Sequence, residues 1–281
     1  MESILQTRML PRAAYHSVMR LANSFRAVFE RDKFGMTWRE AKRLEYSPRL
    51  LRTHAPLLGK RIALTDPYWY LFCYDEIFKG EIYKFKTDSP APLIIDCGAN
   101  IGLSVIYFKH LYPNAKIVAF EPDVEIFRVL QDNINTFRLD NVTLYPTAVW
   151  SSDTELTFQP DGSVGGRIEG VGNNGVRVKT ARLKDFINQK VDFLKIDIEG
   201  AEHEVLKDCR ESLANVDYLF VEHHGIQDGE KTLGEILEII RDAGFHYHIK
   251  EAYPIRHPFI LQERSIVYPL QLNIFAFRNL I

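Results

Sequence analysis

Cysteine is scarce in this sequence. The 281 residues include three cysteines, Cys73, Cys97 and Cys209, which lie far apart and form no C-x-x-C pair. An odd number of widely spaced cysteines argues against a disulfide framework and against a structural zinc site. The same scarcity is typical of proteins in a reducing compartment, and we therefore expect a cytoplasmic location.

Long apolar runs are missing as well. The sequence has no stretch of about 18 consecutive apolar residues that could cross a bilayer. The N-terminus carries Arg8 and Arg12 where a signal peptide would keep an unbroken apolar segment. The sequence therefore predicts no transmembrane segment and no cleaved leader.

Acidic and basic residues are unevenly distributed, although the net charge is only −2. Residues 1–61 contain 13 Lys and Arg against 5 Asp and Glu, whereas the remainder contains 22 basic and 32 acidic residues. We interpret the basic segment as a helical cap on an acidic body. The alternative is peripheral contact with a membrane surface or an acidic partner. The overall balance does not favour a nucleic-acid-binding protein.

The pattern of apolar residues changes near residue 90. Before it, helical spacing predicts a mainly helical accessory region over residues 1–90. After it, short apolar segments alternate with amphipathic ones. This alternation predicts a domain over 91–281 with a mostly parallel, doubly wound, Rossmann-like α/β sheet of seven strands. The expected strands are 93–97, 116–121, 142–149, 191–198, 216–222, 245–250 and 271–278, and the expected helices are 102–111, 123–138, 201–209 and 232–243.

The segment "IIDCGANIGLS" holds the first candidate binding site. Asp96 ends a predicted strand, and Gly98 and Gly102 lie in the turn that follows, which is the usual ligand cradle of a doubly wound sheet. The dinucleotide fingerprint G-x-G-x-x-G is absent because position 100 is Asn100. A carboxylate beside the turn would repel a pyrophosphate but attract a cation. These four residues therefore favour S-adenosyl-L-methionine, which carries an ammonium and a sulfonium group, over NAD.

A second acidic residue strengthens the case for a nucleoside cofactor. Glu121 ends the next predicted strand, in "KIVAFEP", 25 residues after Asp96. A carboxylate at this place can accept hydrogen bonds from both ribose hydroxyls. By analogy with other proteins of this fold, we expect the adenine beside Thr147 and Ala148, where the third strand ends.

Residues 93–222 resemble the FkbM-type methyltransferases, which are class I enzymes that use S-adenosylmethionine. The resemblance rests on "IIDCGANIGLS", "AFEPD", "LYPTAVW" and above all "LKIDIEGAEHEVL" at 194–206. It implies the class I methyltransferase fold and methyl transfer to a hydroxyl group. Because the usual acceptors of the family are sugars, polyketides and related natural products, it also implies a small-molecule or glycan acceptor.

The end of the fourth predicted strand supplies candidate catalytic residues. Methyl transfer to a hydroxyl requires the acceptor oxygen in line with the sulfonium methyl, and a group that takes its proton. In "KIDIE" the side chains alternate, so Lys195, Asp197 and Glu199 share one face of the strand. Three charges on one face are costly to bury without a purpose, and we therefore assign them to the catalytic site.

The fifth predicted strand, "YLFVEHH", adds Glu222 and a histidine to the same edge. Because successive strand residues point in opposite directions, at most one of His223 and His224 faces the site, and we assign His223 as the general base. Asp197 and Glu222, together with a histidine, would also form an oxygen-rich set suited to Mg²⁺. A Mg²⁺ site is therefore an alternative arrangement of these groups.

A glycine-rich segment follows the third strand. Six of the 16 glycines fall within residues 162–175, so the segment has low helix and strand propensity. We expect a mobile flap over the cofactor or acceptor, with Arg167 available to bind the acceptor. The alternative is a hairpin tip without a role.

Two other functions compete with methyl transfer. The first is a catalytically inactive scaffold protein on the same fold, which the retained acidic residues and glycines of the cofactor site argue against. The second is an NAD-dependent epimerase or reductase. The missing G-x-G-x-x-G and the lack of a recognisable Tyr-x-x-x-Lys element disfavour it.

Overall fold

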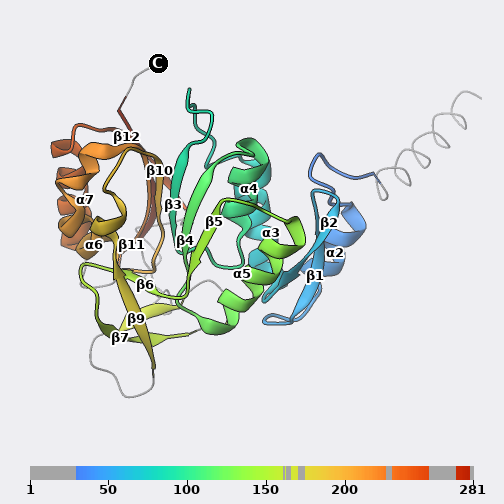
Figure 1. Ribbon diagram of the computed structural model, residues 1–281. Helices are drawn as coiled ribbons and strands as arrows, with labels where there is room; N and C mark the ends of the chain where they lie inside the picture. The colour runs from blue at the N-terminus through green and yellow to red at the C-terminus, as the bar shows by residue number, and fades with distance from the viewer. Residues whose placement is uncertain are drawn as a thin grey trace, which may run out of the picture.

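A seven-stranded sheet forms the centre of the protein. The computed structural model describes residues 30–160, 162, 166–169, 175–225, 230–252 and 270–278. All seven predicted strands belong to this sheet, whose strand order is β12-β13-β11-β10-β3-β4-β5 (Figure 1). The strands are β3 (Leu93–Cys97), β4 (Lys116–Phe120), β5 (Val142–Tyr145), β10 (Val191–Ile196), β11 (Val216–Gly225), β12 (His246–Glu251) and β13 (Leu270–Phe277).

The sheet is mostly parallel, as predicted. Strands β5, β4, β3, β10 and β11 run parallel to one another, whereas β13 is antiparallel to both of its neighbours. Parallel strands end at the same edge, so the residues that follow β3, β4, β5 and β10 meet there. The first residues of β13 lie at that edge as well, because this strand runs in the opposite direction.

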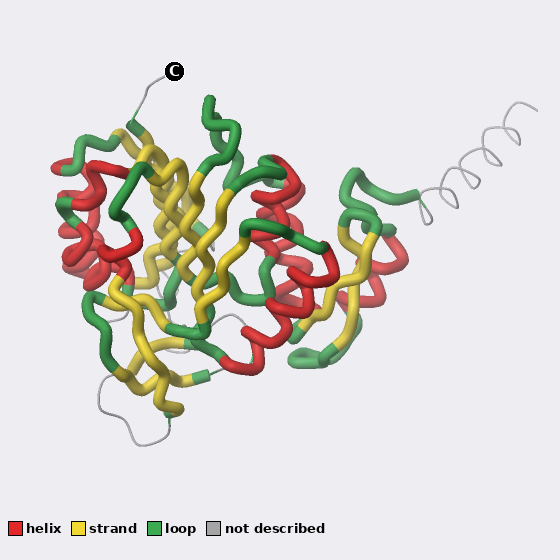
Figure 2. Tube along the Cα trace, in the orientation of Figure 1, coloured by secondary structure: helices red, strands yellow, loops and turns green. Residues whose placement is uncertain are grey.

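Helices cover both faces of the sheet (Figure 2). One apolar core includes residues of α4 and α5, and a second includes residues of α6 and α7. Strand residues alternate between the two cores: Ile94 belongs to the first, Ile95 to the second, and both are fully buried. The helices are α4 (Leu103–Leu111), α5 (Val124–Phe137), α6 (Glu202–Cys209) and α7 (Glu230–Asp242), with 3-10 turns η2 (Leu183–Phe186) and η3 (Ser212–Asn215).

The N-terminal region is less purely helical than its sequence indicates. Its described part contains a two-stranded hairpin, which the sequence analysis did not predict, besides its helices. Asn133 of α5 holds this hairpin, since its side chain accepts a hydrogen bond from the Ala63 N–H (2.8 Å) and donates one to the Ala63 carbonyl (3.0 Å). Residues 1–29, which carry much of the predicted helix, lie outside the described residues. The elements are α2 (Trp38–Glu45), β1 (Thr53–Leu57), β2 (Lys60–Leu64), α3 (Pro67–Cys73) and the π-helical segment η1 (Tyr74–Lys79).

A smaller four-stranded sheet follows β5. The prediction of one strand over 142–149 was wrong in its second half, because β5 ends at Tyr145 and the chain then enters another sheet. Pro146, at the break, has no N–H with which to continue the ladder. The new strands are β6 (Ala148–Trp150), β7 (Glu155–Gln159), β8 (Arg167–Glu169) and β9 (Val176–Arg182), in the order β6-β9-β7-β8.

None of the helices in the described part of the chain is both long enough and apolar enough to traverse a membrane.

Candidate functional site

A cavity of about 230 Å³ opens at the carboxyl edge of the central sheet. Its walls come from the segments that follow β3, β4, β5 and β10, from β11 and β13, and from α3 and η1 of the N-terminal region. The sheet order places the β4 and β5 walls on one side of β3, and the β10, β11 and β13 walls on the other. With about 4.8 Å between neighbouring strands, the cavity is elongated across the sheet.

The turn after β3 has the conformation that its glycines predict. Gly98 and Gly102 have φ values of +88° and +91°, and Asn100 between them also has a positive φ. A Cβ atom at Gly98 would lie 1.9 Å from the carbonyl oxygen of Asp197, so only glycine fits. This close approach joins the β3 turn to the end of β10, and Gly98 and Asn100 line the cavity. Gly102 does not: a Cβ atom there would lie 2.7 Å from the Leu130 side chain of α5, so this glycine allows the turn to pack against α5 and its expected contact with the cofactor needs correction.

Asp96 does not reach the cavity. Its side chain is completely buried, accepts a hydrogen bond from the Ser104 hydroxyl, and lies 3.3 Å from the ammonium of Lys195. The expectation that Asp96 itself meets a cationic ligand therefore needs correction. Its charge acts on Lys195, since both groups lie away from water.

Lys195 connects the two strands at the centre of the site. Its ammonium donates a hydrogen bond to the Gly98 carbonyl (2.9 Å) and pairs with Asp96 and with Asp197 (3.1 Å). Burial opposes the charged form, but the two carboxylates outweigh it and hold the pKa of Lys195 well above its ordinary value. Lys195 is therefore a permanent cation and cannot accept a proton during a reaction.

Glu121, Thr147 and Ala148 line the cavity on the β4–β5 side. The two oxygens of Glu121 accept hydrogen bonds from the backbone N–H groups of Asn100 and Asp123, both at 2.9 Å. Burial raises the pKa of Glu121 to about 8. The Thr147 hydroxyl is buried and has no hydrogen-bond partner among the described residues, so this side offers an unused polar group to a ligand.

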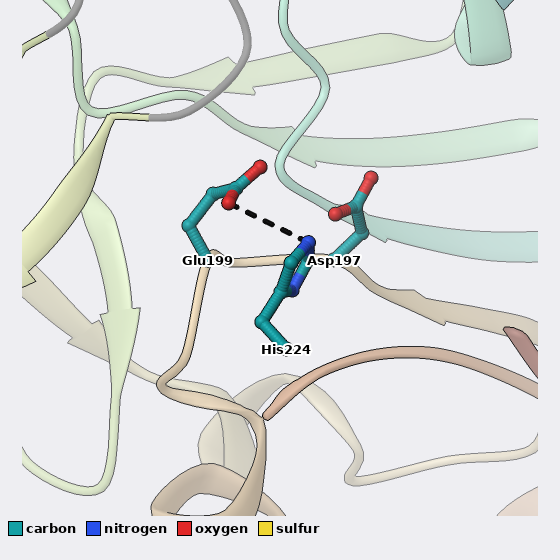
Figure 3. Close-up of side chains that lie close together, drawn as sticks. All are labelled: Asp197, Glu199 and His224. Atoms are coloured by element: carbon teal, nitrogen blue, oxygen red, sulfur yellow. Dashed lines mark ion pairs between the residues drawn. The ribbon is translucent and has the colours of Figure 1, made fainter. Parts of the chain in front are cut away.

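Asp197, Glu199 and His224 form a compact cluster at the ends of β10 and β11 (Figure 3). One ligand atom of each lies within 4.8 Å of the others. The His224 Nε2 atom is 3.5 Å from a Glu199 oxygen. Glu199 has a φ of +57°, and burial raises the pKa of its carboxyl to about 8. Asp197 and Glu199 line the cavity, whereas His224 lies behind them.

Glu202 holds this cluster in place, a role that the sequence analysis did not identify. One of its oxygens accepts hydrogen bonds from the backbone N–H groups of Ile198 and Gly200 and lies 3.1 Å from the His224 Nδ1 atom. Burial lowers the pKa of His224, but the hydrogen bond and the charge of Glu202, with help from Glu199, raise it to about 10. His224 is therefore a second cation of the site.

His223 points away from the cavity. Only one of the two histidines faces the site, as expected, but it is His224 and not the assigned His223. The His223 side chain is buried, neither ring nitrogen has a hydrogen-bond partner among the described residues, and burial lowers its pKa. Strand phase explains the difference, because a one-residue step along β11 turns the side chain to the other face.

Glu222 completes the acidic wall of the cavity. It accepts a hydrogen bond from the Gln271 side chain at 2.6 Å, and burial raises its pKa to about 8. Gln271 comes from β13, far away in sequence. Glu76 of η1 faces the same end of the cavity, and so do Trp69 and aromatic neighbours from α3. No motif marks Glu76, Trp69 or Gln271 in the sequence, so sequence reasoning missed all three.

The acidic cluster does not fit Mg²⁺ well. The expected ligands were Asp197 and Glu222 with a histidine, whereas the structure gathers Asp197 and Glu199 around His224. Magnesium prefers six oxygen ligands in an octahedron. Here the third group is an imidazole, one nitrogen of which is 3.1 Å from Glu202, and its raised pKa of about 10 keeps it protonated. Lys195 and His224 already supply positive charge where a metal ion would.

The glycine-rich segment reaches the cavity, because Gly166 lies in its wall. Within the segment, β8 pairs with β7, so that Arg167 stands opposite Gln159. The Arg167 side chain and residues 163–165 and 170–174 lie outside the described residues. The expected flap motion and acceptor contact of this segment stay predictions.

Comparison with known proteins gives consistent matches. A model of the methyltransferase FkbM domain matches residues 96–247, which is more than half of the chain. Methyltransferase 1 of Beauveria bassiana is 29% identical over 48% of this chain and 66% of its own length. Methyltransferase sdnD of Sordaria araneosa is 31% identical over 48% of this chain and 67% of its own length. The chain thus spans about two thirds of these relatives. The 2-O-methyltransferase NoeI of Sinorhizobium fredii is 24% identical over 54% of this chain and 72% of its own length.

Proposed function

Because the chain belongs to the FkbM methyltransferase family, we propose that it transfers the methyl group of S-adenosylmethionine to a hydroxyl oxygen of a small molecule or glycan. One observation carries the proposal. A single cavity joins a nucleoside-binding end at Glu121 to an acidic end at Asp197 and Glu222. The name of NoeI, a 2-O-methyltransferase, supports oxygen as the acceptor atom.

In this proposal the ribose of S-adenosylmethionine binds to Glu121. Each Glu121 oxygen accepts one backbone hydrogen bond and keeps a lone pair for a ribose hydroxyl. The adenine lies beside Thr147 and Ala148, where the Thr147 hydroxyl, which has no hydrogen-bond partner among the described residues, supports a polar contact. Gly98 and Asn100 bring the backbone of the turn to the ligand. The positive charge of the sulfonium suits the surplus of carboxyl groups at the acidic end.

The acceptor enters the acidic end, between the β10–β11 wall and α3. Asp197, Glu199 and Glu222 orient the acceptor hydroxyl and stabilise the cationic methyl donor. Lys195 positions Asp197 and the β3 turn, to both of which it is bonded. His223 has no part in the reaction, and no step passes through a metal ion. The described part of the N-terminal region, residues 30–90, acts as a cap, because α3 and η1 supply one wall of the acceptor space.

The test is a binding and product assay. Isothermal titration with S-adenosylmethionine and with NAD, in buffer containing EDTA, should give heat of binding for the first cofactor only. Incubation with a panel of glycans and hydroxylated natural products, followed by mass spectrometry, should then show a product one methyl group heavier. Cofactor binding without any methylated product would support the alternative of an inactive scaffold protein.

Above pH 8, where the Glu121 carboxyl is ionised, Glu121→Ala should weaken S-adenosylmethionine binding by about 1.5–3 kcal/mol, the range for hydrogen bonds to a charged group. The fold should persist, because Glu121 lies in the cavity wall and not in either apolar core. Glu125→Ala is the matched control, since its carboxylate pairs with exposed arginines away from this cavity. Titration calorimetry measures both variants, and an unchanged affinity in folded Glu121→Ala would refute the ribose assignment.

Asp197→Asn should lower turnover about a hundredfold or more, because asparagine keeps the size of the side chain but removes the charge. Cofactor affinity should change much less than turnover, and added EDTA should change neither variant nor parent. The control is Asp217→Asn, at the far end of β11, where the carboxylate pairs with Lys190 at the surface. Parental turnover in Asp197→Asn would show that Asp197 is only structural.

A further inference from the structure

One carboxyl group at the acidic end of the cavity has no partner in the part of the chain that the structure describes. Four line this end: Glu76, Asp197, Glu199 and Glu222. Asp197 pairs with Lys195, Glu199 faces His224, and Glu222 accepts a hydrogen bond from Gln271. The Glu76 carboxyl makes no hydrogen bond or ion pair with any described residue. Its carboxyl is therefore available to a ligand.

The π-helical segment η1, which carries Glu76, is anchored in the core by two of its aromatic residues. The neighbouring Tyr74 is fully buried, and its hydroxyl donates to both oxygens of Asp32, at 2.7 and 2.8 Å. Tyr74 also stacks on Phe78 with 5.6 Å between ring centroids, and Phe78 packs edge-on against Tyr107 of α4 at 5.5 Å. π-helical turns are rare and often occur at functional sites. Here the turn presents Glu76 to the cavity while its other side is fixed in the core.

The surroundings of Glu76 disfavour the charged form of its carboxyl group. Burial raises its pKa to about 7, the ammonium of Lys250 on β12 works against this rise, and the charge of Asp197 adds to it. Glu222 lies close enough that Glu76 raises its pKa in turn. The nearby Cys73 thiol stays protonated, because burial raises its pKa strongly. A proton acceptor near neutrality needs a pKa of this kind.

The other groups at this end are less suited to accept a proton. Lys195 is a permanent cation, and His224 has its Nδ1 atom at Glu202 and carries a proton at neutral pH. Asp197 is already paired with the ammonium of Lys195 at 3.1 Å. Glu199 is paired with His224, and Glu222 accepts a hydrogen bond from Gln271.

We infer that Glu76 is the proton acceptor of the methyl transfer, which rests on the function proposed above. The acceptor oxygen attacks the sulfonium methyl, and a new C–O bond forms. The C–S bond breaks, and its electron pair stays on sulfur as S-adenosylhomocysteine. The acceptor O–H bond breaks, and its proton moves to a Glu76 oxygen. Glu76 lies outside residues 96–247, so the base comes from the cap and not from the matched family domain.

The test compares Glu76→Gln, Glu76→Asp and Asp75→Asn with the parent, using an acceptor found in the product screen. Asp75 is the matched control, because it precedes Glu76 in η1, is exposed, and pairs only with Lys79 among the described residues. Glu76→Gln should lower kcat about a hundredfold or more. Glu76→Asp should retain part of the activity, and Asp75→Asn should match the parent.

The pH profile separates a base from a structural residue. Because the carboxyl must be ionised to accept a proton, parental kcat should rise as the pH increases through about 7. This rise should be absent in Glu76→Gln. S-adenosylmethionine affinity should stay within about twofold of the parent in all variants. A Glu76→Gln enzyme with parental kcat and an unchanged pH profile would overturn the inference while leaving the proposed function intact. If the parent enzyme did not bind S-adenosylmethionine, that result would instead refute the proposed function.

Discussion

Replacing Lys195 with methionine should lower the free energy of unfolding by about 3–5 kcal/mol, the usual effect of removing one partner of a buried ion pair. Methionine keeps the length of the side chain but leaves Asp96 charged and without its cation. Asp96 is completely buried. Among the described residues, the Asp96 oxygen nearer to Lys195 has no hydrogen bond, and the second oxygen accepts one from Ser104. Urea denaturation followed by circular dichroism measures the change.

Two further variants separate charge from shape. Lys190→Met removes an exposed lysine that pairs with Asp217, and its effect should stay within about 1 kcal/mol. The double variant Asp96→Asn/Lys195→Met should recover part of the lost stability, because it removes the unpaired buried charge. If Lys195→Met were as mild as Lys190→Met, the Asp96–Lys195 pair would not be the electrostatic centre of the site.

Gly98→Ala should destabilise the protein by about 2–5 kcal/mol. Part of this comes from the left-handed backbone, which costs about 1–2 kcal/mol for a residue with a Cβ atom. The rest comes from the new Cβ, which would lie 1.9 Å from the Asp197 carbonyl and adds about 1–3 kcal/mol, as for an overpacked core. The displaced β10 end should also weaken S-adenosylmethionine binding at least tenfold.

Gly59→Ala is the matched control for this prediction. Gly59 has a φ of +78°, but a Cβ atom there would meet nothing within 4 Å. Its replacement therefore reports the backbone strain without the collision. Thermal and urea denaturation of both variants, with titration calorimetry for the cofactor, measure the difference. Equal losses of stability in the two variants would show that the turn after β3 can move away from Asp197.

Most of the fold could be predicted because its strands are buried on both faces. Such strands appear in the sequence as short apolar segments, and all seven expected segments belong to the central sheet. The extension of one strand to residue 149 was wrong because Pro146 ends the ladder at β5, although the apolar pattern continues into β6. The hairpin of β1 and β2 was missed, since two five-residue strands carry little periodicity against a helical background.

The candidate site was predictable where its residues follow one another along the chain. The β3 turn and Glu121 lie in the cavity wall, as do Asp197, Glu199 and Glu222, because each comes at the end of a strand that runs to the same edge. The choice between His223 and His224 was not predictable, since it depends on a single-residue phase of β11. Asp96 was assigned to the ligand because its partner, Lys195, is 99 residues away in the sequence.

By itself, the sequence determined the order of strands and helices, the glycine turn after the first strand of the sheet, and the family. These features depend on local spacing: apolar periodicity, backbone freedom at glycine, and consecutive motif residues. Only the tertiary structure decided which charged groups lie next to one another. It buried Asp96 against Lys195, joined His224 to Glu202, and brought Glu76 of the cap to the acidic wall. Such pairings join residues from different strands and helices, and the pKa of each group follows from burial and neighbours that no local pattern records.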